Sequence, residues 1–336
     1  MFNKIQKYIQ NMRDHKEYAL LTSSDCKDPS PNEGYEHELK VPAQSHHKAL
    51  LFLLFAISLL GLSSIFILIS RASLWARSES TTAVACKEPE IRREWRALTP
   101  DEREDFTRAI HTPHLYTLHT WQKALRQHCN FNGTIPYWDW SLDWLDLANS
   151  SIWSPTTGFG PNGDISLPVT VGRGHCVTSG PFRNLRPIMY NHTYEQHCLS
   201  RGFRDGEMEG RLPSEPFSPE SIGGMMRNET YGGFIRRVEF LLHNRMHEAI
   251  GGDFLALTAA NDPIFFVHHA QIDRLWWKWQ QERPSRRLHE YEGKHMYNST
   301  GEASIGDMLV FGGLVEDVPV RTVMDTENGL LCYRYS

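Results

Sequence analysis

The chain has 336 residues, of which 40% are hydrophobic and 22% charged, and this composition predicts a folded protein rather than a disordered one. A net charge of -5 argues against a nucleic-acid partner, because proteins that bind nucleic acids normally carry a basic excess. The 6 cysteines are too few for a small disulfide scaffold, whereas 17 histidines supply many copies of the commonest metal-binding side chain.

The N-terminal part of the chain predicts a membrane anchor. Residues 49–70 form an apolar run of 22 residues without a charge or a proline. At about 1.5 Å per residue, a helix of this length spans a hydrocarbon core about 30 Å thick. A cleaved signal peptide is the alternative, but the run is too long for one and begins too far from Met1. We therefore expect a single retained transmembrane helix.

The segments on either side of this run differ in composition. Residues 1–48 mix Lys, Glu, Asp, Ser and Pro with few aromatic residues, which predicts a disordered cytoplasmic tail. Residues 71–85 are expected to form a stalk. The remaining residues, 86–336, are enough for one domain with a substantial core.

Sequons and cysteines indicate which side of the membrane the domain occupies. Five Asn-x-Ser/Thr sequons occur, all after the apolar run, at Asn132, Asn149, Asn191, Asn228 and Asn298. This distribution predicts a single-pass glycoprotein whose domain is luminal or extracellular. Five of the 6 cysteines lie on the same side, so one of these five lacks a partner among them. Cys176 and Cys198 flank a loop rich in Gly, Pro and Arg, and we expect them to pair.

Two helices are predicted at the start of the domain. The sequence Thr-Pro-Asp-Glu at residues 99–102 places a good cap, a proline and acidic side chains at a helix start. This helix is expected to run to about His111, before Pro113. A second helix is expected to begin near His114, with its apolar side chains on one face, and to end at Asn132-Gly133.

Two further helices follow a long segment without periodicity. Residues 149–232 are rich in Gly, Pro, Ser and Asn and predict irregular structure. A third helix fits residues 229–250 and ends at Gly251-Gly252, and a fourth fits residues 264–282 and ends before Pro284. Helices joined by long irregular connections favour a mainly α fold, a helix bundle with a site in its middle.

Four histidines on the last two helices predict a metal site. His243 and His247 are one helical turn apart and point the same way, so both imidazoles can reach one metal. His268 and His269 lie in an apolar stretch that should be buried. Adjacent side chains on a helix point about 100° apart, so only one of these two should join the first pair. Imidazoles suit copper, zinc, iron and nickel, and three nitrogens alone do not choose among these metals.

Three stretches of sequence carry a family resemblance: HNRMHEAIGG from His243, NDPIFFVHHAQIDRLWWKWQ from Asn261 and GTIPYWDW from Gly133. With these motifs the chain resembles the tyrosinase and polyphenol oxidase family of type 3 copper proteins, especially its short fungal members. The resemblance extends over about residues 86–320. It implies a four-helix bundle in which two coppers, each held by three histidines, bind dioxygen between them.

The resemblance also assigns roles to individual residues. It places the second copper, CuB, on His243, His247 and His269, with His268 beside the metal rather than bound to it. Asn244 matches a catalytic residue that, with an upstream glutamate, holds a water over the metals.

Glu239 is the candidate for that glutamate, although its spacing from His243 is shorter than usual in the family. Asp273 and Arg274 are implied to lock the helix that carries His269.

The first copper, CuA, has fewer counterparts in this chain. His114 falls where the third CuA ligand belongs, although Pro113 and Leu115 replace the tryptophan and arginine that flank it in the family. The segment that carries the two earlier ligands has no counterpart, and His111 is the nearest spare imidazole. The family implies two coppers per chain, of which CuB is the better matched.

The implied activity is a copper-dependent oxidation. Members of the family hydroxylate phenols or oxidise catechols to o-quinones with molecular oxygen. The partner is then a phenolic small molecule, such as a secondary metabolite, or a tyrosine-containing peptide. A catalytically impaired copper-binding remnant is the alternative, because the segment that carries the two earlier CuA ligands is missing from this chain.

Overall fold

The structure is a computed structural model that describes residues 86–109, 118–191, 193–294, 301–311 and 315–336. The tail (1–48), the transmembrane helix (49–70) and the stalk (71–85) lie outside these residues and stay predictions. Within the described part of the chain, no helix combines the length and the apolar character that crossing a membrane requires.

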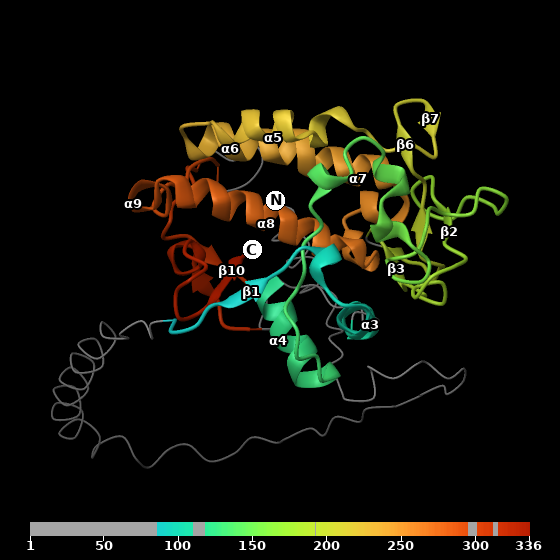
Figure 1. The fold of residues 1–336 in the computed structure, drawn as a ribbon, viewed down its shortest axis with the longest axis horizontal. Coiled ribbons are helices and arrows are strands. Elements are labelled where there is room, and N and C mark those ends of the chain that lie inside the picture. The colour runs from blue at the N-terminus through green and yellow to red at the C-terminus, as the bar shows by residue number, and fades with distance from the viewer. Residues whose placement is uncertain (1–85, 110–117, 192, 295–300, 312–314) are drawn as a thin grey trace, which may run out of the picture. The chain divides into compact units, whose positions relative to one another are not determined.

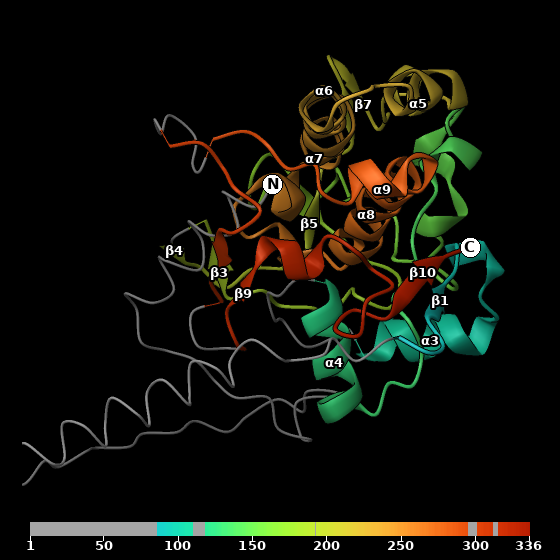
Figure 2. The ribbon, with the colours of Figure 1, turned by 90° about the vertical axis from the view of Figure 1, so that its left-hand side faces the viewer.

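A long central helix, α8 (Ile264–Glu282), organises the described domain. It has the bounds predicted for the fourth helix, and the short helix α9 (Pro284–Arg287) begins at the expected proline. Helices α5 (Pro219–Met226), α6 (Tyr231–Arg237) and α7 (Asn244–Ile250) lie on one side of α8. Helix α4 (Leu118–Cys129) and strands β1 (Glu90–Arg92) and β10 (Tyr333–Tyr335) lie on the other side (Figure 1 and Figure 2).

Stacked aromatic rings hold the helices on both sides of α8. On one side, Trp121 of α4 stacks on Phe266 with ring centroids 3.5 Å apart. On the other side, Phe234 of α6 stacks on Trp279 at 5.0 Å. All four rings are buried. Such pairs add about 0.5–1.5 kcal/mol each beyond the burial of their surface, so α8 is held from both faces.

The first helix starts where the sequence predicts, whereas the second helix ends earlier than predicted. Helix α3 (Pro100–Ala109) starts as predicted, with a reciprocal cap: the Thr99 hydroxyl accepts from the amide of Glu102, and the Glu102 carboxylate accepts from the amide of Thr99. The predicted junction near His111 and His114 lies outside the described residues. Helix α4 ends at Cys129, earlier than predicted, because Asn130 adopts a left-handed φ of 53°.

The segment predicted to be irregular, residues 149–232, contains more regular structure than expected. Helix α5 lies within it, capped by the Ser218 hydroxyl, which accepts from the amide of Ser221 at 3.1 Å. Gly223 and Gly224 inside this helix weaken its sequence signal, which is why the prediction missed it.

Short two-stranded sheets and 3-10 turns account for most of the remaining ordered backbone. The antiparallel pairs are β2 (His175–Cys176) with β5 (Ser200–Arg201), β3 (Met189–Tyr190) with β4 (Thr193–Tyr194), β6 (Arg204–Asp205) with β7 (Met208–Glu209), and β8 (Met308–Leu309) with β9 (Val318–Pro319). The 3-10 turns are Trp95–Ala97, Trp140–Leu142, Leu147–Asn149, Ser151–Trp153, Glu215–Phe217, Gly252–Leu255, Ala259–Asn261 and Val320–Val323.

Disulfides tie the loops and the two ends of the domain. Cys176 and Cys198 are bonded, which confirms the predicted pair. Cys86 bonds Cys332 beside the parallel pair of β1 and β10, so the beginning and the end of the domain are linked covalently. Cys129 is disulfide-bonded as well, and no cysteine of the described residues is a free thiol.

Candidate metal centre

The helix predicted over residues 229–250 is observed from Tyr231 to Ile250, with an unpredicted change of winding in its middle. Residues Val238–His243 form a π-helical segment between α6 and α7. Such segments occur frequently at functional sites, because the wider turn re-aims side chains. Here the π-helical segment ends at His243, and the helix itself ends as expected at Gly251, whose φ is +65°.

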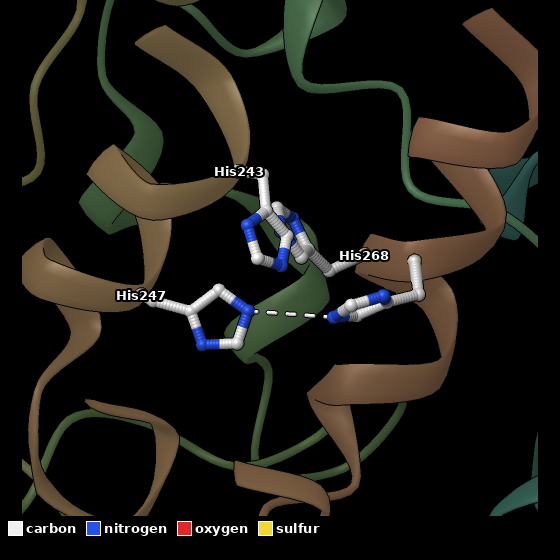
Figure 3. Close-up of side chains that lie close together, drawn as sticks. His243, His247 and His268 are labelled. Carbon is white, nitrogen blue, oxygen red and sulfur yellow. Dashed lines mark hydrogen bonds between the residues drawn. The ribbon is translucent and has the colours of Figure 1, made fainter. Parts of the chain in front are cut away.

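Four imidazoles meet between this helix and α8. His243 and His247 point toward His268 (Figure 3), and one ring nitrogen from each of these three and from His269 lies within 4.8 Å of the others. The Nε2 atoms of His247 and His269 are 3.4 Å apart. Two ligands at about 2.0–2.1 Å from a tetrahedral metal are about 3.4 Å apart, so this spacing fits one shared ion.

Both His268 and His269 lie beside the first pair, whereas the sequence predicted that only one of them would join it as a ligand; which of the two binds a metal stays a prediction. Their ring centroids are 5.3 Å apart, and each lies 5.0–5.8 Å from the rings of His243 and His247. The two side chains leave α8 in different directions, but each is long enough for its ring to converge on the facing helix.

Hydrogen bonds orient two of the imidazoles for metal binding. The Nδ1 atom of His247 lies 2.5 Å from the carbonyl oxygen of Phe254, and a carbonyl can only accept. Nδ1 therefore carries a proton, and in the neutral ring Nε2, which lies 3.4 Å from His269 Nε2, is the nitrogen that can bind a metal. The Nδ1 atom of His243 lies 3.1 Å from the Asn244 side-chain oxygen. Metal-binding histidines almost always make such a bond with their other nitrogen.

His268 is fully buried, and neither of its ring nitrogens has a hydrogen-bond partner. Burial, followed by the neighbouring histidines, holds the pKa of His268 and of His269 well below the ordinary value. Both rings are therefore neutral, which is the form that binds metals. A buried polar atom without a partner costs about 1–3 kcal/mol, and a metal ion would offset this cost. The donor set consequently fits an ion that prefers imidazole, such as copper.

Glu239 and Asn244, the predicted catalytic pair, both lie against His243. A carboxylate oxygen of Glu239 is 3.5 Å from His243 Nδ1. Burial raises the pKa of Glu239, but the hydrogen bond and the charge of His243 bring it below its usual value. The structure thus places both residues at the cluster, and their role in holding a water stays a prediction.

Two phenylalanines that the sequence did not single out form walls of the cluster. Phe254 stacks on His247 with centroids 4.1 Å apart, and Phe265 stacks on His269 at 3.9 Å. Phe265 precedes His269 by one helical turn, which is a signal that could have identified it. Phe254 lies in the short 3-10 turn Gly252–Leu255 beyond the helix, where no periodicity points to it.

Ion pairs and hydrogen bonds fix α8 in place. Arg274 donates to Asp139 at 3.1 Å, and Asp273 accepts from the hydroxyls of Tyr333 and Tyr335 at 2.7 and 2.6 Å. These contacts agree with the locking role that the resemblance implied for Asp273 and Arg274.

A further ion pair, which the sequence did not indicate, lies at the N-terminal end of the same helix. Arg201 and Asp262 are both fully buried and make two contacts, at 2.7 and 2.8 Å. Asp262 also accepts from the amide of Ile264 at 3.1 Å, so the pair is joined to the first turn of α8.

The residues predicted for CuA are not part of the described structure. His111 and His114 both fall within residues 110–117. In the part of the chain that is described, the four-histidine cluster is the only group of three or more His, Cys, Asp or Glu placed to hold a metal. The four-helix bundle around two coppers therefore stays a prediction.

Comparisons with known proteins agree with the motifs. A family model described as the common central domain of tyrosinase matches residues 109–282. The chain is 54% identical over 296 residues to tyrosinase-like protein phomQ2 of Diaporthe leptostromiformis, covering 77% of this chain and 75% of the relative. It is 50% identical over 293 residues to tyrosinase ustQ of Aspergillus flavus, covering 76% and 82%.

A solved structure shares the fold at lower sequence identity. A mutant polyphenol oxidase of Thermothelomyces thermophila matches with a TM-score of 0.60 and 22% identity, covering 80% of this chain and 93% of that one. At this identity the likeness shows the fold alone, a helical domain with long irregular loops.

Proposed function

We propose that this chain, which belongs to the tyrosinase family, oxidises phenols or catechols with molecular oxygen in a copper-dependent reaction. The observation that carries the proposal is the cluster of four imidazoles, two of them oriented by hydrogen bonds and one without any partner. Tyrosinase-like oxidases are the relatives found, and the cluster supplies the ligand chemistry that copper prefers.

In this proposal the chain supplies ligands, orientation and an apolar surrounding. His243, His247 and His269 hold the copper, as the resemblance implied. Copper, when bound, supplies the one-electron chemistry and the activation of oxygen that side chains lack. The rings of Phe254 and Phe265, stacked on two of the ligands, keep water from the sides of the cluster that they cover.

The substrate is proposed at the level of its chemistry. A phenolic small molecule of fungal secondary metabolism or a tyrosine-containing peptide both offer the phenol ring that the reaction needs. The relatives at 50–54% identity are fungal tyrosinase-like proteins, which supports a related role in a fungal product. A panel of phenols, catechols and tyrosyl peptides, assayed by oxygen uptake, distinguishes these classes.

A catalytically impaired remnant that binds one metal is the second candidate. It is favoured by the sequence before His114, which lacks the segment that carries two CuA ligands in the family. Metal content separates the two. Two coppers per chain with catechol turnover support the oxidase, one copper without turnover supports the remnant, and no copper overturns both. The variant His247→Ala removes one imidazole of the cluster and should lower the copper content. His289→Ala, at an exposed histidine outside the cluster, is its matched control.

The membrane location of the protein is also a proposal. The apolar run at residues 49–70 and the one-sided sequons support a single-pass membrane protein with a luminal or extracellular domain. The protein should then stay with membranes after a carbonate wash, and glycosidase should lower its apparent mass. Release into the soluble fraction without a change in mass would contradict both parts.

A further inference from the structure

We propose that His197 is a positioning residue for the metal centre, because its ion pair with Asp253 fixes the turn that orients His247. The inference rests on the proposed function, since that function places a metal on His247. It adds no ligand to the metal and gives a role to a histidine outside the four-histidine cluster. Three observations support it, and they lead from the cluster outward to His197.

The first observation is that one turn holds His247 in two ways. The carbonyl oxygen of Phe254 accepts from His247 Nδ1, and the ring of Phe254 stacks on the imidazole with an angle of 7° between the planes. The amide of Phe254 donates to the Gly251 carbonyl at 3.0 Å, within the turn Gly252–Leu255. A shift of this turn would move both the acceptor and the ring that set the direction of His247 Nε2.

The second observation is that Asp253, the neighbour of Phe254 in this turn, is fully buried and held from outside the turn. One carboxylate oxygen accepts from His197 Nε2 at 2.8 Å and from the Asn261 side chain at 3.0 Å. The other accepts from the amide of Ser200 at 2.9 Å. Of these three donors, only His197 can carry a positive charge. A buried carboxylate that loses its counter-charge is strongly destabilised, so the position of the turn depends on the charge of His197.

The third observation is that both ring nitrogens of His197 face acceptors. Nδ1 lies 2.6 Å from the carbonyl oxygen of Glu195, and Nε2 faces the Asp253 carboxylate. A neutral imidazole has one N–H and satisfies only one of these acceptors, so the geometry favours the charged ring. Burial lowers the pKa of His197, but the hydrogen bonds and charges of Asp253 and Glu195 raise it above its ordinary value. Tyr190 of β3, with ring centroids 6.2 Å apart, stays neutral because burial raises its pKa.

The role of His197 should therefore depend on pH. Below the raised pKa of His197 the pair is ionic and holds the turn. Above it the ring is neutral, and one of its two acceptors loses a donor. The metal affinity of the folded protein should contain a contribution from His197 that is complete below about pH 6.5 and is lost as the pH rises through the raised pKa.

A purely structural role is the competing explanation. The segment that carries His197 is also held by the disulfide between Cys176 and Cys198 and by the pairing of β2 with β5. If the ion pair only adds to this attachment, its loss lowers the stability of the fold and leaves the metal affinity of the folded protein unchanged.

The test measures the Co²⁺ affinity of the purified full chain by visible absorption, from about pH 6 to about pH 8.5. His197→Gln keeps a hydrogen-bond donor and removes the charge. We expect it to weaken Co²⁺ binding about 10-fold at the lower pH, the low end of the cost of losing an outer-shell partner. The difference from the wild type should shrink as the pH rises.

His175→Gln is the matched control for His197→Gln. His175 lies on β2 beside the same disulfide, but its Nδ1 bonds the Leu167 carbonyl at 2.7 Å rather than an acid. This variant should keep the wild-type affinity at every pH. Near-ultraviolet circular dichroism checks that both variants are folded.

The metal-free wild type gives a second measurement that needs no variant. The amide of Phe254 closes the turn, so its protection from hydrogen exchange should fall as the pH rises through the raised pKa of His197. Amides in the middle of α8, such as that of Ile272, should keep their protection.

The possible outcomes separate this inference from the proposed function. A wild type that binds Co²⁺, with an unchanged affinity in His197→Gln or a loss that is the same at every pH, overturns the inference and leaves the proposed function intact. A wild type that binds neither Co²⁺ nor Cu²⁺ overturns both. If His197→Gln does not fold, a constant protection of the Phe254 amide across the pH range overturns the inference, and a fall confined to the turn supports it.

Discussion

Replacing Asp262 by Asn should destabilise the domain strongly, because it removes the charge that balances Arg201. Neither side chain is exposed to solvent. The Arg201 guanidinium donates to both carboxylate oxygens of Asp262, at 2.7 and 2.8 Å, and its remaining nitrogen donates to the carbonyls of Phe159, Gly160 and Pro161. Asparagine keeps the shape of the acid but leaves the buried cation without a counter-charge.

The size of the expected loss of stability follows from the burial of the ion pair. Removing one partner of a fully buried ion pair costs about 3–5 kcal/mol, whereas removing one partner of an exposed pair costs less than about 1 kcal/mol. For a domain of this size each kcal/mol corresponds to about 2–4 °C, so Asp262→Asn should lower the melting temperature by about 6–20 °C. Glu229→Gln is the control, since Glu229 pairs with Arg283 and their side chains are 68% and 51% exposed.

The assay is urea unfolding of the metal-free protein, followed by tryptophan fluorescence. We expect Asp262→Asn to lower the midpoint and leave the slope unchanged, which would show that stability rather than the unfolded state has changed. Arg201→Met should be at least as damaging, because three carbonyl groups and the carboxylate all lose a donor. A cost for Asp262→Asn no larger than that of Glu229→Gln would refute the reasoning.

Three further predictions concern the metal, the pH dependence and the disulfide. His247→Ala should abolish tight copper binding, measured by dialysis and metal analysis, and copper retained at the wild-type stoichiometry would contradict the assignment. Burial lowers the pKa of His197, but the hydrogen bond and charge of Asp253 raise it above its usual value. The stabilisation by this pair is therefore complete below about pH 6.5 and is lost as the pH rises through the raised pKa of His197. His197→Gln should consequently lower the free energy of unfolding in urea more at about pH 5.5 than at about pH 8.5. Equal losses at the two pH values would contradict this prediction. Replacing Cys86 and Cys332 together by Ser should lower the free energy of unfolding by up to about 5 kcal/mol, because the bond closes a loop with a separation of 246 residues; an unchanged urea midpoint would show that the bond adds nothing.

The local structure around the site was predictable from the sequence. The bounds of α8, the helix ending at Gly251 and the cap at Thr99 all follow from short-range signals: apolar periodicity, glycine and proline positions, and side chains that bond nearby amides. The spacing of His243 and His247 likewise places both imidazoles on one helical face without reference to the rest of the fold.

The arrangement of the site depended on contacts between residues far apart in the chain. Nothing in the sequence distinguishes a His268 that faces away from one that reaches the cluster, because the outcome depends on how α7 crosses α8. The π-helical segment, the stacking of Phe254 on His247 and the pairing of Arg201 with Asp262 are decided in the same way. Periodicity determines which face of a helix is apolar, but the partner that this face meets, and the side chains brought together there, are set by the packing of the whole domain.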